Sequence, residues 1–322
     1  MLRFLIRRLL TGLLVIWLIS IVVFLLFFVF PPNVAVELLG KFGGKNPQLV
    51  ATVTHQLGLD QPIYEQYWHF LVRLVHGDLG FSYYSHQQVT YLIGQALPKT
   101  LSLAIGAAIL WLVFGVLIGV LSATRPRTIW DRGATVFALT GISFPTFVLG
   151  NLFLLVLFFY PKQAGFTLFP PSGSYVPITQ NVVMWAYGLI LPWVTLALVT
   201  MATYVRLTRG QMLEVLGEDY IRTARSKGLR RSRVTYRHGL RAALVPVITQ
   251  FGIDVGSLLG GVIVTEQVFG INGLGRLSVQ SVVNQDEPVI IAVVLLAAVF
   301  VVVANIIVDL LYAVLDPRVR LA

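Results

Sequence analysis

The stretch Leu9–Phe30 reads LLTGLLVIWLISIVVFLLFFVF and contains no charged residue. Because a helix of about 20 apolar residues crosses the roughly 30 Å of hydrocarbon in a bilayer, this stretch predicts a membrane-spanning helix. Arg3, Arg7 and Arg8 precede it, as basic residues precede a signal peptide. The apolar run is longer than the hydrophobic region of an ordinary signal peptide, which favours a retained span.

The composition of the whole chain agrees with a membrane protein. Of 322 residues, 57% are hydrophobic and 12% are charged, and the net charge is +10. A soluble surface carries roughly a quarter or more of charged residues, so a soluble protein of this length is excluded. The absence of cysteine excludes disulfides, thiolate metal sites and cysteine nucleophiles.

Five further apolar runs are long enough to cross a bilayer. We therefore expect an all-α integral membrane protein with six transmembrane helices, near 9–30, 99–123, 134–160, 182–205, 246–268 and 288–315. Pro145 and Pro192 fall inside the third and fourth runs, where a missing backbone donor favours kinks.

The distribution of basic residues predicts the orientation. Eighteen of the 24 Lys and Arg residues fall before the first span, between spans two and three, in segment 206–245, or after the last span. Short cytoplasmic loops are enriched in Lys and Arg, so both termini are expected in the cytoplasm.

The segment 31–98 is too long for a plain connection and predicts a small extracytoplasmic cap. Apolar spacing indicates helices around Leu49–Leu57 and Ile63–Val75. Seven aromatic residues between Tyr64 and Tyr84 favour either an interfacial belt with core packing or a docking surface for another protein.

The segment 206–245 combines acidic residues with ten Lys and Arg residues. Its apolar spacing predicts short helices hinged at Gly228. Taken alone, such a basic amphipathic stretch is typical of a loop that binds anionic lipid, and nucleic-acid binding is a remoter alternative.

Several motifs along the chain resemble one family. Asp219–Leu229 reads DYIRTARSKGL and Arg237–Pro246 reads RHGLRAALVP. Together with LGLDQP at 57–62, GDLG at 77–80, LPKT at 97–100, PPSG at 170–173 and VTEQVFGINGLG at 264–275, they resemble the peptide/nickel permeases of ABC importers, in the first-permease form with a long segment after span one. Arg222-Thr223-Ala224 stands where the family pattern has Glu-Ala-Ala. The resemblance therefore does not fix the individual contacts with a partner.

The resemblance implies a division of the chain and a role for segment 206–245. Residues 1–30 form the N-terminus and first helix, 31–98 the cap, and 99–322 a five-helix permease core with cytoplasmic coupling helices in the loop 206–245. The residues expected to contact an ATPase are Asp219, Tyr220, Ala224, Gly228 and Leu229.

The resemblance also implies partners, namely a homologous second permease, two ATPase subunits and an extracytoplasmic solute-binding protein, in a prokaryotic plasma membrane. The chain has no G-x-x-x-x-G-K-[ST] phosphate loop, so ATP hydrolysis is expected on separate subunits that bind ATP and Mg²⁺. We expect this chain to bind no cofactor and no nucleic acid. It is expected to contact membrane lipid.

Two acids in the fifth span are candidate pathway residues. A carboxylate in hydrocarbon costs a few kcal/mol unless it faces protein or water. Asp254 lies in a span with Gly252, Gly256, Gly260 and Gly261, which permits close helix packing. It lines the pathway or is a buried hydrogen-bonded acid. Glu266 is also a pathway candidate, but it lies near the outer boundary, where simple solvation would account for it.

No arrangement of residues indicates an enzyme or a metal site. His69 and His76 could share a helix face, but no Cys or carboxylate clusters with them. The sequence GINGLG at 270–275 predicts a tight turn. The expected function is thus a non-enzymatic permease subunit of an importer for short peptides. The alternatives are nickel, glutathione or haem-like cargo in the same architecture, a stand-alone channel or secondary transporter, and an integral membrane enzyme.

Overall fold

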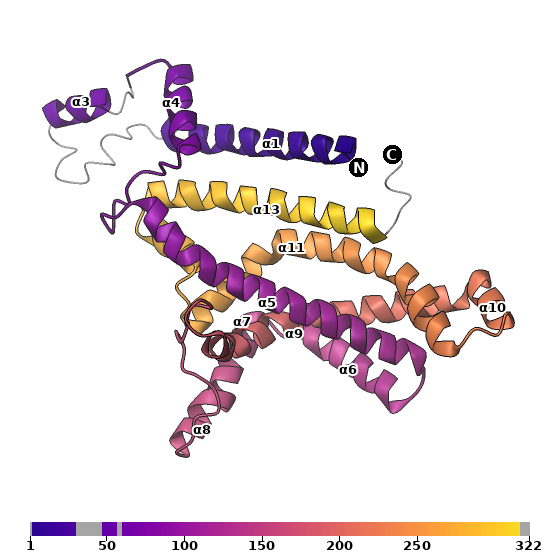
Figure 1. Cartoon of the computed structure of the whole chain (residues 1–322). Helices are drawn as coiled ribbons and strands as arrows, with labels where there is room; N and C mark the ends of the chain where they lie inside the picture. Colours follow the sequence, from indigo (N-terminus) through magenta and orange to yellow (C-terminus); the bar gives the residue numbers. More distant parts are fainter. Residues whose placement is uncertain (1, 30–46, 57–59, 316–322) are drawn as a thin grey trace. The chain divides into compact units, whose positions relative to one another are not determined.

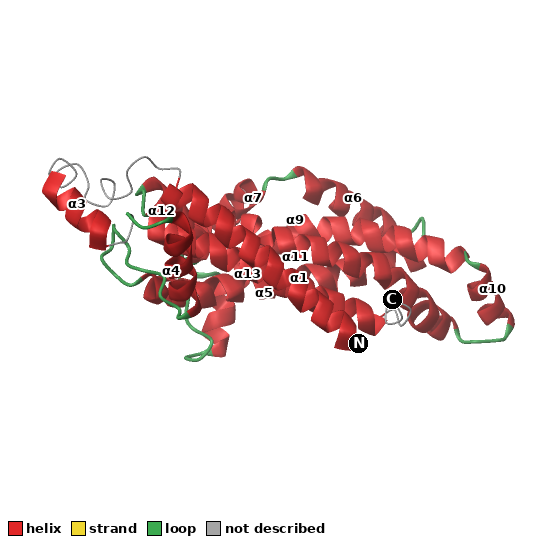
Figure 2. Ribbon diagram, turned by 90° about the horizontal axis from the view of Figure 1, so that it is seen from above, coloured by secondary structure: helices red, strands yellow, loops and turns green. Residues whose placement is uncertain are grey.

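The computed structural model describes residues 2–29, 47–56 and 60–315, and most of these residues are helical (Figure 1). Figure 2 shows helices and loops without a strand in the described part, where the one β-type pairing is an isolated bridge between Phe81 and Gln88. The expected all-α fold is confirmed.

Most of the described helices follow one another closely along the chain, and longer connections separate α4 from α5 and α8 from α9. Three are π-helical segments, denoted η. The elements are α1 (Leu2–Phe24), η1 (Leu25–Val29), α3 (Pro47–Gln56), α4 (Ile63–Val75), α5 (Val89–Thr124), α6 (Ile129–Ser143), α7 (Thr146–Phe153), η2 (Leu154–Phe159), α8 (Tyr160–Gln163), α9 (Val182–Gly217), α10 (Asp219–Ser226), η3 (Arg233–Leu240), α11 (Arg241–Phe269), α12 (Leu274–Val283) and α13 (Glu287–Leu315).

Among the described residues, five helical stretches have the length and hydropathy of a membrane span. They are Ile6–Val29, Val89–Thr124, Thr146–Gln163, Val182–Gly217 and Glu287–Leu310. The expected span at 246–268 lies within the 29-residue helix α11. At about 1.5 Å per residue, α11 is long enough to cross the hydrocarbon, and the count of six spans stays a prediction.

The expected third span, 134–160, was wrong as a single helix. Helix α6 ends at Ser143, Phe144 is extended, and Pro145 precedes a new helix. Proline disfavours a helical conformation in the residue before it, so the break falls at Phe144. The apolar stretch long enough to span therefore begins at Thr146. Pro192, in contrast, lies inside α9, which continues through it.

The expected boundaries of segment 206–245 also shift. Helix α9 does not end at 205 but continues to Gly217, and Arg241 already belongs to α11. The hinge was predicted correctly: α10 ends before Gly228, which adopts a φ of 75°. Helices α3 and α4 confirm the two expected helices of segment 31–98, although residues 30–46 and 57–59 lie outside the described part.

The chain separates into two compact units. The first comprises residues 97–276 and those from 304 onward, and the second comprises residues 2–96 and 277–303. In the first unit, the core lies where α5, α9 and α11 pack together around Trp111, Tyr204 and Val247. A side chain at Gly115 or Gly119 would collide with Tyr204 or Thr208, so these glycines allow α5 and α9 to approach closely.

The second unit has a smaller core. Val23 and Phe24 of α1 pack with Phe70 of α4 and with Ile291 and Leu295 of α13. Tyr67 of α4 also exchanges a hydrogen bond with Ser20 of α1, at 2.9 Å between the two oxygens. These contacts hold α4 against the end of the first span.

Candidate functional site

The predicted coupling residues lie on α10 and the turn that follows it. We use the name α10 surface for Asp219, Tyr220, Ala224, Gly228 and Leu229. Asp219 opens the eight-residue helix, which has a strongly amphipathic pattern. Ile221 is fully buried, so one side of the helix is fixed to the protein. The structure brings all five predicted residues together at one end of the first unit.

The turn after α10 is closed by backbone hydrogen bonds. The amide of Gly228 donates to the carbonyl of Arg225 at 2.9 Å, and the amide of Leu229 donates to that of Ala224 at 3.4 Å. Glycine adopts the positive φ that this turn needs without steric cost. The turn is therefore a defined structure that fixes the direction of the chain after α10.

The other face of α10 is open. The Asp219 and Arg222 side chains are 95% and 72% exposed, and the ion pair between them has an N–O distance of 3.3 Å. An ion pair at such exposure contributes little to stability. Tyr220 is also exposed, at 47%. The α10 surface thus presents polar and aromatic groups that the fold itself does not need.

A buried ion pair lies on the helices next to this surface, and sequence analysis missed it. Asp131 of α6 is 6% exposed. It accepts a hydrogen bond from Arg209 Nε at 2.7 Å, one from the Ser122 hydroxyl at 2.6 Å and one from the Arg127 amide at 2.9 Å. The hydrogen bond from Arg209 is the largest of the effects that hold the pKa of Asp131 well below its usual range.

The Asp131 contacts join four parts of the first unit. Ser122 belongs to α5, Arg127 to the connection between α5 and α6, and Arg209 to α9, little more than two turns before its end. In the sequence, the only indication of this site is that one acid, Asp131, lies among the basic residues between the second and third predicted spans. The ion pair fixes the end of α9 from which α10 extends.

Asp254, the first candidate pathway acid, bridges α11 and α9. The Tyr204 hydroxyl donates to its Oδ2 at 2.8 Å, and the Gln250 amide donates to its Oδ1 at 2.9 Å. Tyr204 itself is fully buried beside Trp111. These contacts favour the alternative of a hydrogen-bonded acid between helices, and the pathway role stays a prediction.

Glu266, the second candidate, is not solvated as expected, because its exposure is 0%. The Thr100 hydroxyl donates to its Oε1 at 2.6 Å, and the Arg276 amide donates to its Oε2 at 2.9 Å. The Leu274 amide in turn donates to the Thr100 oxygen at 2.7 Å. We use the name Glu266 cluster for Thr100, Glu266, Leu274 and Arg276.

The Glu266 cluster accounts for the GINGLG sequence. Leu274 and Arg276 are in the first turn of α12, so Glu266 and Thr100 accept from amides that have no partner inside that helix. A side chain at Gly273 would collide with Glu266 and Thr100, and one at Gly275 would collide with Ile263. With Gly270 at a φ of 63°, the tight turn predicted from the sequence is confirmed.

The histidines do not form a common site in the described residues. The His76 ring lies 2.7 Å from the carbonyl oxygen of Val72, where it caps α4. No group of three His, Cys, Asp or Glu residues that could hold a metal ion occurs in the part of the chain that the structure describes.

Comparisons with known proteins identify the family to which the chain belongs. The family "Binding-protein-dependent transport system inner membrane component" matches residues 115–321, and its N-terminal domain family matches residues 1–104. A probable peptide ABC transporter permease of Sinorhizobium fredii is 38% identical over 317 residues, 98% of this chain and 99% of that protein. The glutathione transport system permease GsiC of Escherichia coli K12 is 38% identical over 320 residues, 99% of each chain.

A solved structure shares the fold. The inward-facing MetNI methionine ABC transporter covers 70% of this chain and 97% of its own, with a TM-score of 0.52 and 18% sequence identity. Among the described residues, five helical stretches are long and apolar enough to cross a membrane, as expected for a membrane component of a transporter. The chain belongs to the family of binding-protein-dependent transport system inner membrane components. It is a multi-pass inner-membrane permease subunit of an ABC importer.

Proposed function

We propose that this permease forms half of an import pathway for short peptides, glutathione among them. The cargo proposal is supported by two relatives of nearly identical length that are named as peptide and glutathione permeases. In this proposal a homologous permease supplies the other half, two ATPase subunits bind ATP and Mg²⁺, and an extracytoplasmic binding protein delivers the peptide. Both termini lie in the cytoplasm.

The observation that carries the coupling proposal is the α10 surface. Ile221 is buried while Asp219 and Arg222 are exposed, so the helix is fixed to its own subunit and offers its polar side. An ATPase that binds the polar side of α10 can move the helix when it changes conformation. Complementary charges can fix the position of the ATPase along the helix. A loop that only anchors lipid would not need the defined turn at Gly228.

Reconstitution of the purified complex in proteoliposomes tests this function. Uptake of a dipeptide, of glutathione, of Ni²⁺ and of haem is compared in the presence of binding protein, with and without ATP. We expect ATP-dependent uptake of the dipeptide and of glutathione. Uptake of Ni²⁺ or haem alone would contradict the cargo proposal, and peptide uptake without ATPase subunits would indicate a stand-alone transporter.

We also propose that Asp254 and Glu266 contribute to the pathway in different ways. Asp254 is partly exposed and offers a counter-charge to the peptide ammonium, whereas the buried Glu266 positions α12. Asp254→Asn removes the charge but keeps an oxygen that can accept from the Tyr204 hydroxyl, so it is expected to slow uptake by more than any fall in complex yield or melting temperature. A parallel loss of stability and uptake would make Asp254 a structural acid, and unchanged uptake would remove it from the pathway.

A further inference from the structure

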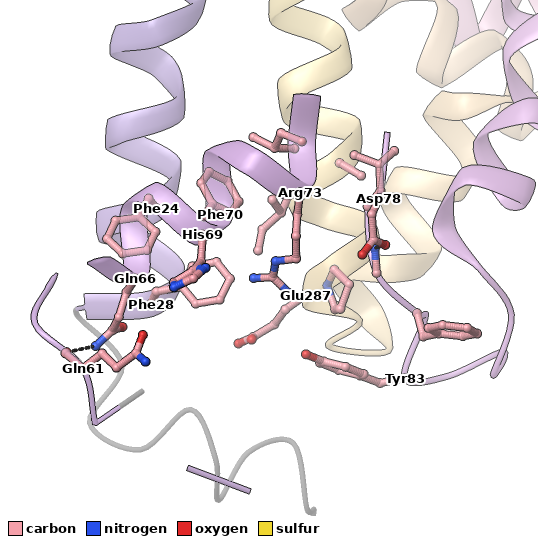
Figure 3. A pocket seen from close by; sticks show the side chains of 17 residues that line it. Phe24, Phe28, Gln61, Gln66, His69, Phe70, Arg73, Asp78, Tyr83 and Glu287 are labelled. Atoms are coloured by element: carbon pink, nitrogen blue, oxygen red, sulfur yellow. Dashed lines mark hydrogen bonds between the residues drawn. The ribbon is translucent and has the colours of Figure 1, made fainter. Parts of the chain in front are cut away.

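A pocket of about 370 Å³ lies in the second unit, and no residue of the α10 surface or of the Glu266 cluster lines it (Figure 3). Its walls come from the end of the first span, from α4, from the segment 78–83 and from the start of α13. The comparisons and the motifs assign no role to it. Its lining combines an aromatic floor with charges of both signs.

The position of the pocket along the spans sets its depth in a bilayer. Phe24 and Phe28 lie in the last two turns of the stretch Ile6–Val29, and Glu287 and Ile291 lie in the first two turns of the stretch Glu287–Leu310. Two apolar spans that end at one place mark the boundary between hydrocarbon and headgroups. The pocket therefore opens where the headgroup and the first part of an acyl chain of a lipid lie.

The floor of the pocket is apolar. Phe24 and Phe28 stack with their ring centroids 5.4 Å apart, and Phe70 lies 5.7 Å from Phe24 and 5.6 Å from Phe28. Phe24 and Phe70 are almost fully buried. This aromatic surface suits a hydrocarbon chain, and a polar ligand would leave its own groups unpaired there.

The rest of the pocket lining contains both acidic and basic side chains. Figure 3 shows Arg73 of α4 and Glu287 of α13 beside one another at the pocket, with the Tyr83 hydroxyl directed toward them. Asp78 adds a second acid to the lining. A guanidinium binds phosphate through paired hydrogen bonds, and a carboxylate accepts from an ammonium.

The position of the pocket in the bilayer, its aromatic floor and its charged side chains together support one ligand. We infer that this pocket binds one zwitterionic phospholipid whose headgroup carries a phosphate and a primary ammonium, as phosphatidylethanolamine does. Arg73 receives the phosphate, Glu287 receives the ammonium, and Phe24, Phe28 and Phe70 cover the upper part of one acyl chain. A lipid of net negative charge is disfavoured because two carboxylates, Asp78 and Glu287, line the same wall.

Native mass spectrometry of the intact importer complex tests this inference. The complex is released from nanodiscs that contain equal amounts of phosphatidylethanolamine and phosphatidylglycerol, and the lipids that remain bound are identified. We expect one retained phosphatidylethanolamine per chain, with at least tenfold lower retention in Arg73→Gln and in Glu287→Gln. Arg73→Lys keeps the charge but loses the paired geometry and should retain an intermediate amount.

Two matched variants separate the pocket from a general effect of surface charge. Glu65→Gln removes an acid from α4 outside the pocket lining, and Lys162→Gln removes a base from the first unit. Both should retain the lipid as the parent does. Equal retention in all variants, or equal retention of phosphatidylglycerol, would overturn the inference. Displacement of the lipid by a short peptide would make the pocket a peptide site and would also overturn it.

Discussion

The α10 surface and the Glu266 cluster each contain an acidic residue, Asp219 in the first and Glu266 in the second, yet the two acids have opposite surroundings. In the Glu266 cluster both carboxylate oxygens of the fully buried Glu266 accept a hydrogen bond. On the α10 surface the Asp219 side chain faces outward, and its ion pair with the neighbouring Arg222 is exposed. The first arrangement stabilises the chain by itself, whereas the second is suited to contact with another molecule.

This contrast gives a practical rule for the chain. Where polar groups are buried and paired, substitution should change stability first and transport as a result. Where they are exposed on a fixed helix, substitution should change transport and leave stability unaffected. The following substitutions test the rule from the largest expected effect to the smallest.

Glu266→Ala should have the largest effect. It removes the acceptor of the Thr100 hydroxyl and of the Arg276 amide at a position where Glu266 is fully buried, and each buried group left unpaired costs about 1–3 kcal/mol. We expect a large fall in melting temperature of the purified complex, measured by tryptophan fluorescence. The neighbouring exposed Gln267→Ala is the control. Equal stability of both variants would show that the cluster does not lock α12.

Gly228→Trp should leave the fold intact but abolish coupling. Tryptophan at a φ of 75° is strained, and its bulk faces open space beside α10. We expect at least tenfold slower uptake, with ATP hydrolysis no longer stimulated by cargo. Gly165→Trp is the matched control, because Gly165 has a φ of 90° in open space outside the α10 surface. If both variants transport equally well, the α10 surface is not the coupling site.

Asp131→Asn should have an intermediate effect on stability. Loss of the charge leaves Arg209 with a weaker partner, which costs about 1–3 kcal/mol where the pair is largely but not fully buried. Because the folded state lowers the pKa of Asp131, its contribution is complete above the ordinary carboxyl pKa of about 4 and is lost only as the pH falls further. The stability difference between variant and parent should therefore be the same at pH 7 and pH 5. A difference that vanishes at pH 5 would contradict the lowered pKa.

Asp219→Asn should have the smallest effect on the isolated permease. Its carboxylate is 95% exposed, so the melting temperature should not change. A contact with an ATPase would nevertheless involve this group, and we expect weaker retention of ATPase subunits on affinity purification, most clearly at low salt. Unchanged retention at low and high salt would remove Asp219 from the contact.

The sequence was sufficient for features that depend on local composition. Apolar runs located four of the five described stretches that could cross a bilayer, and part of the fifth, because hydrocarbon imposes the same requirement of length and hydropathy on every helix that crosses it. The 13 residues of α4 and the hinge at Gly228 also followed from local patterns of apolar residues and glycine.

Features that depend on distant partners could not be predicted in this way. Glu266 accepts from Thr100, 166 residues earlier, and Asp131 pairs with Arg209, 78 residues later. The distribution of Lys and Arg along the sequence counts Arg209 only as evidence for the orientation of the spans. Its ion pair with Asp131 has a structural role that this count cannot detect. The break at Phe144 was missed because a proline inside an apolar run is compatible with a kink as well as with a complete interruption.

The length of α9 has a consequence for the reach of the subunit. Its last apolar turns end near Arg206, and the helix continues for 12 residues from Arg206 to Gly217. These residues add about 18 Å of rigid rod, whereas the headgroup layer on one side of a bilayer is only about 5–8 Å thick. If the hydrocarbon ends at Arg206 and α9 runs along the bilayer normal, α10 begins beyond the lipid headgroups, and a soluble protein would contact it without displacing lipid.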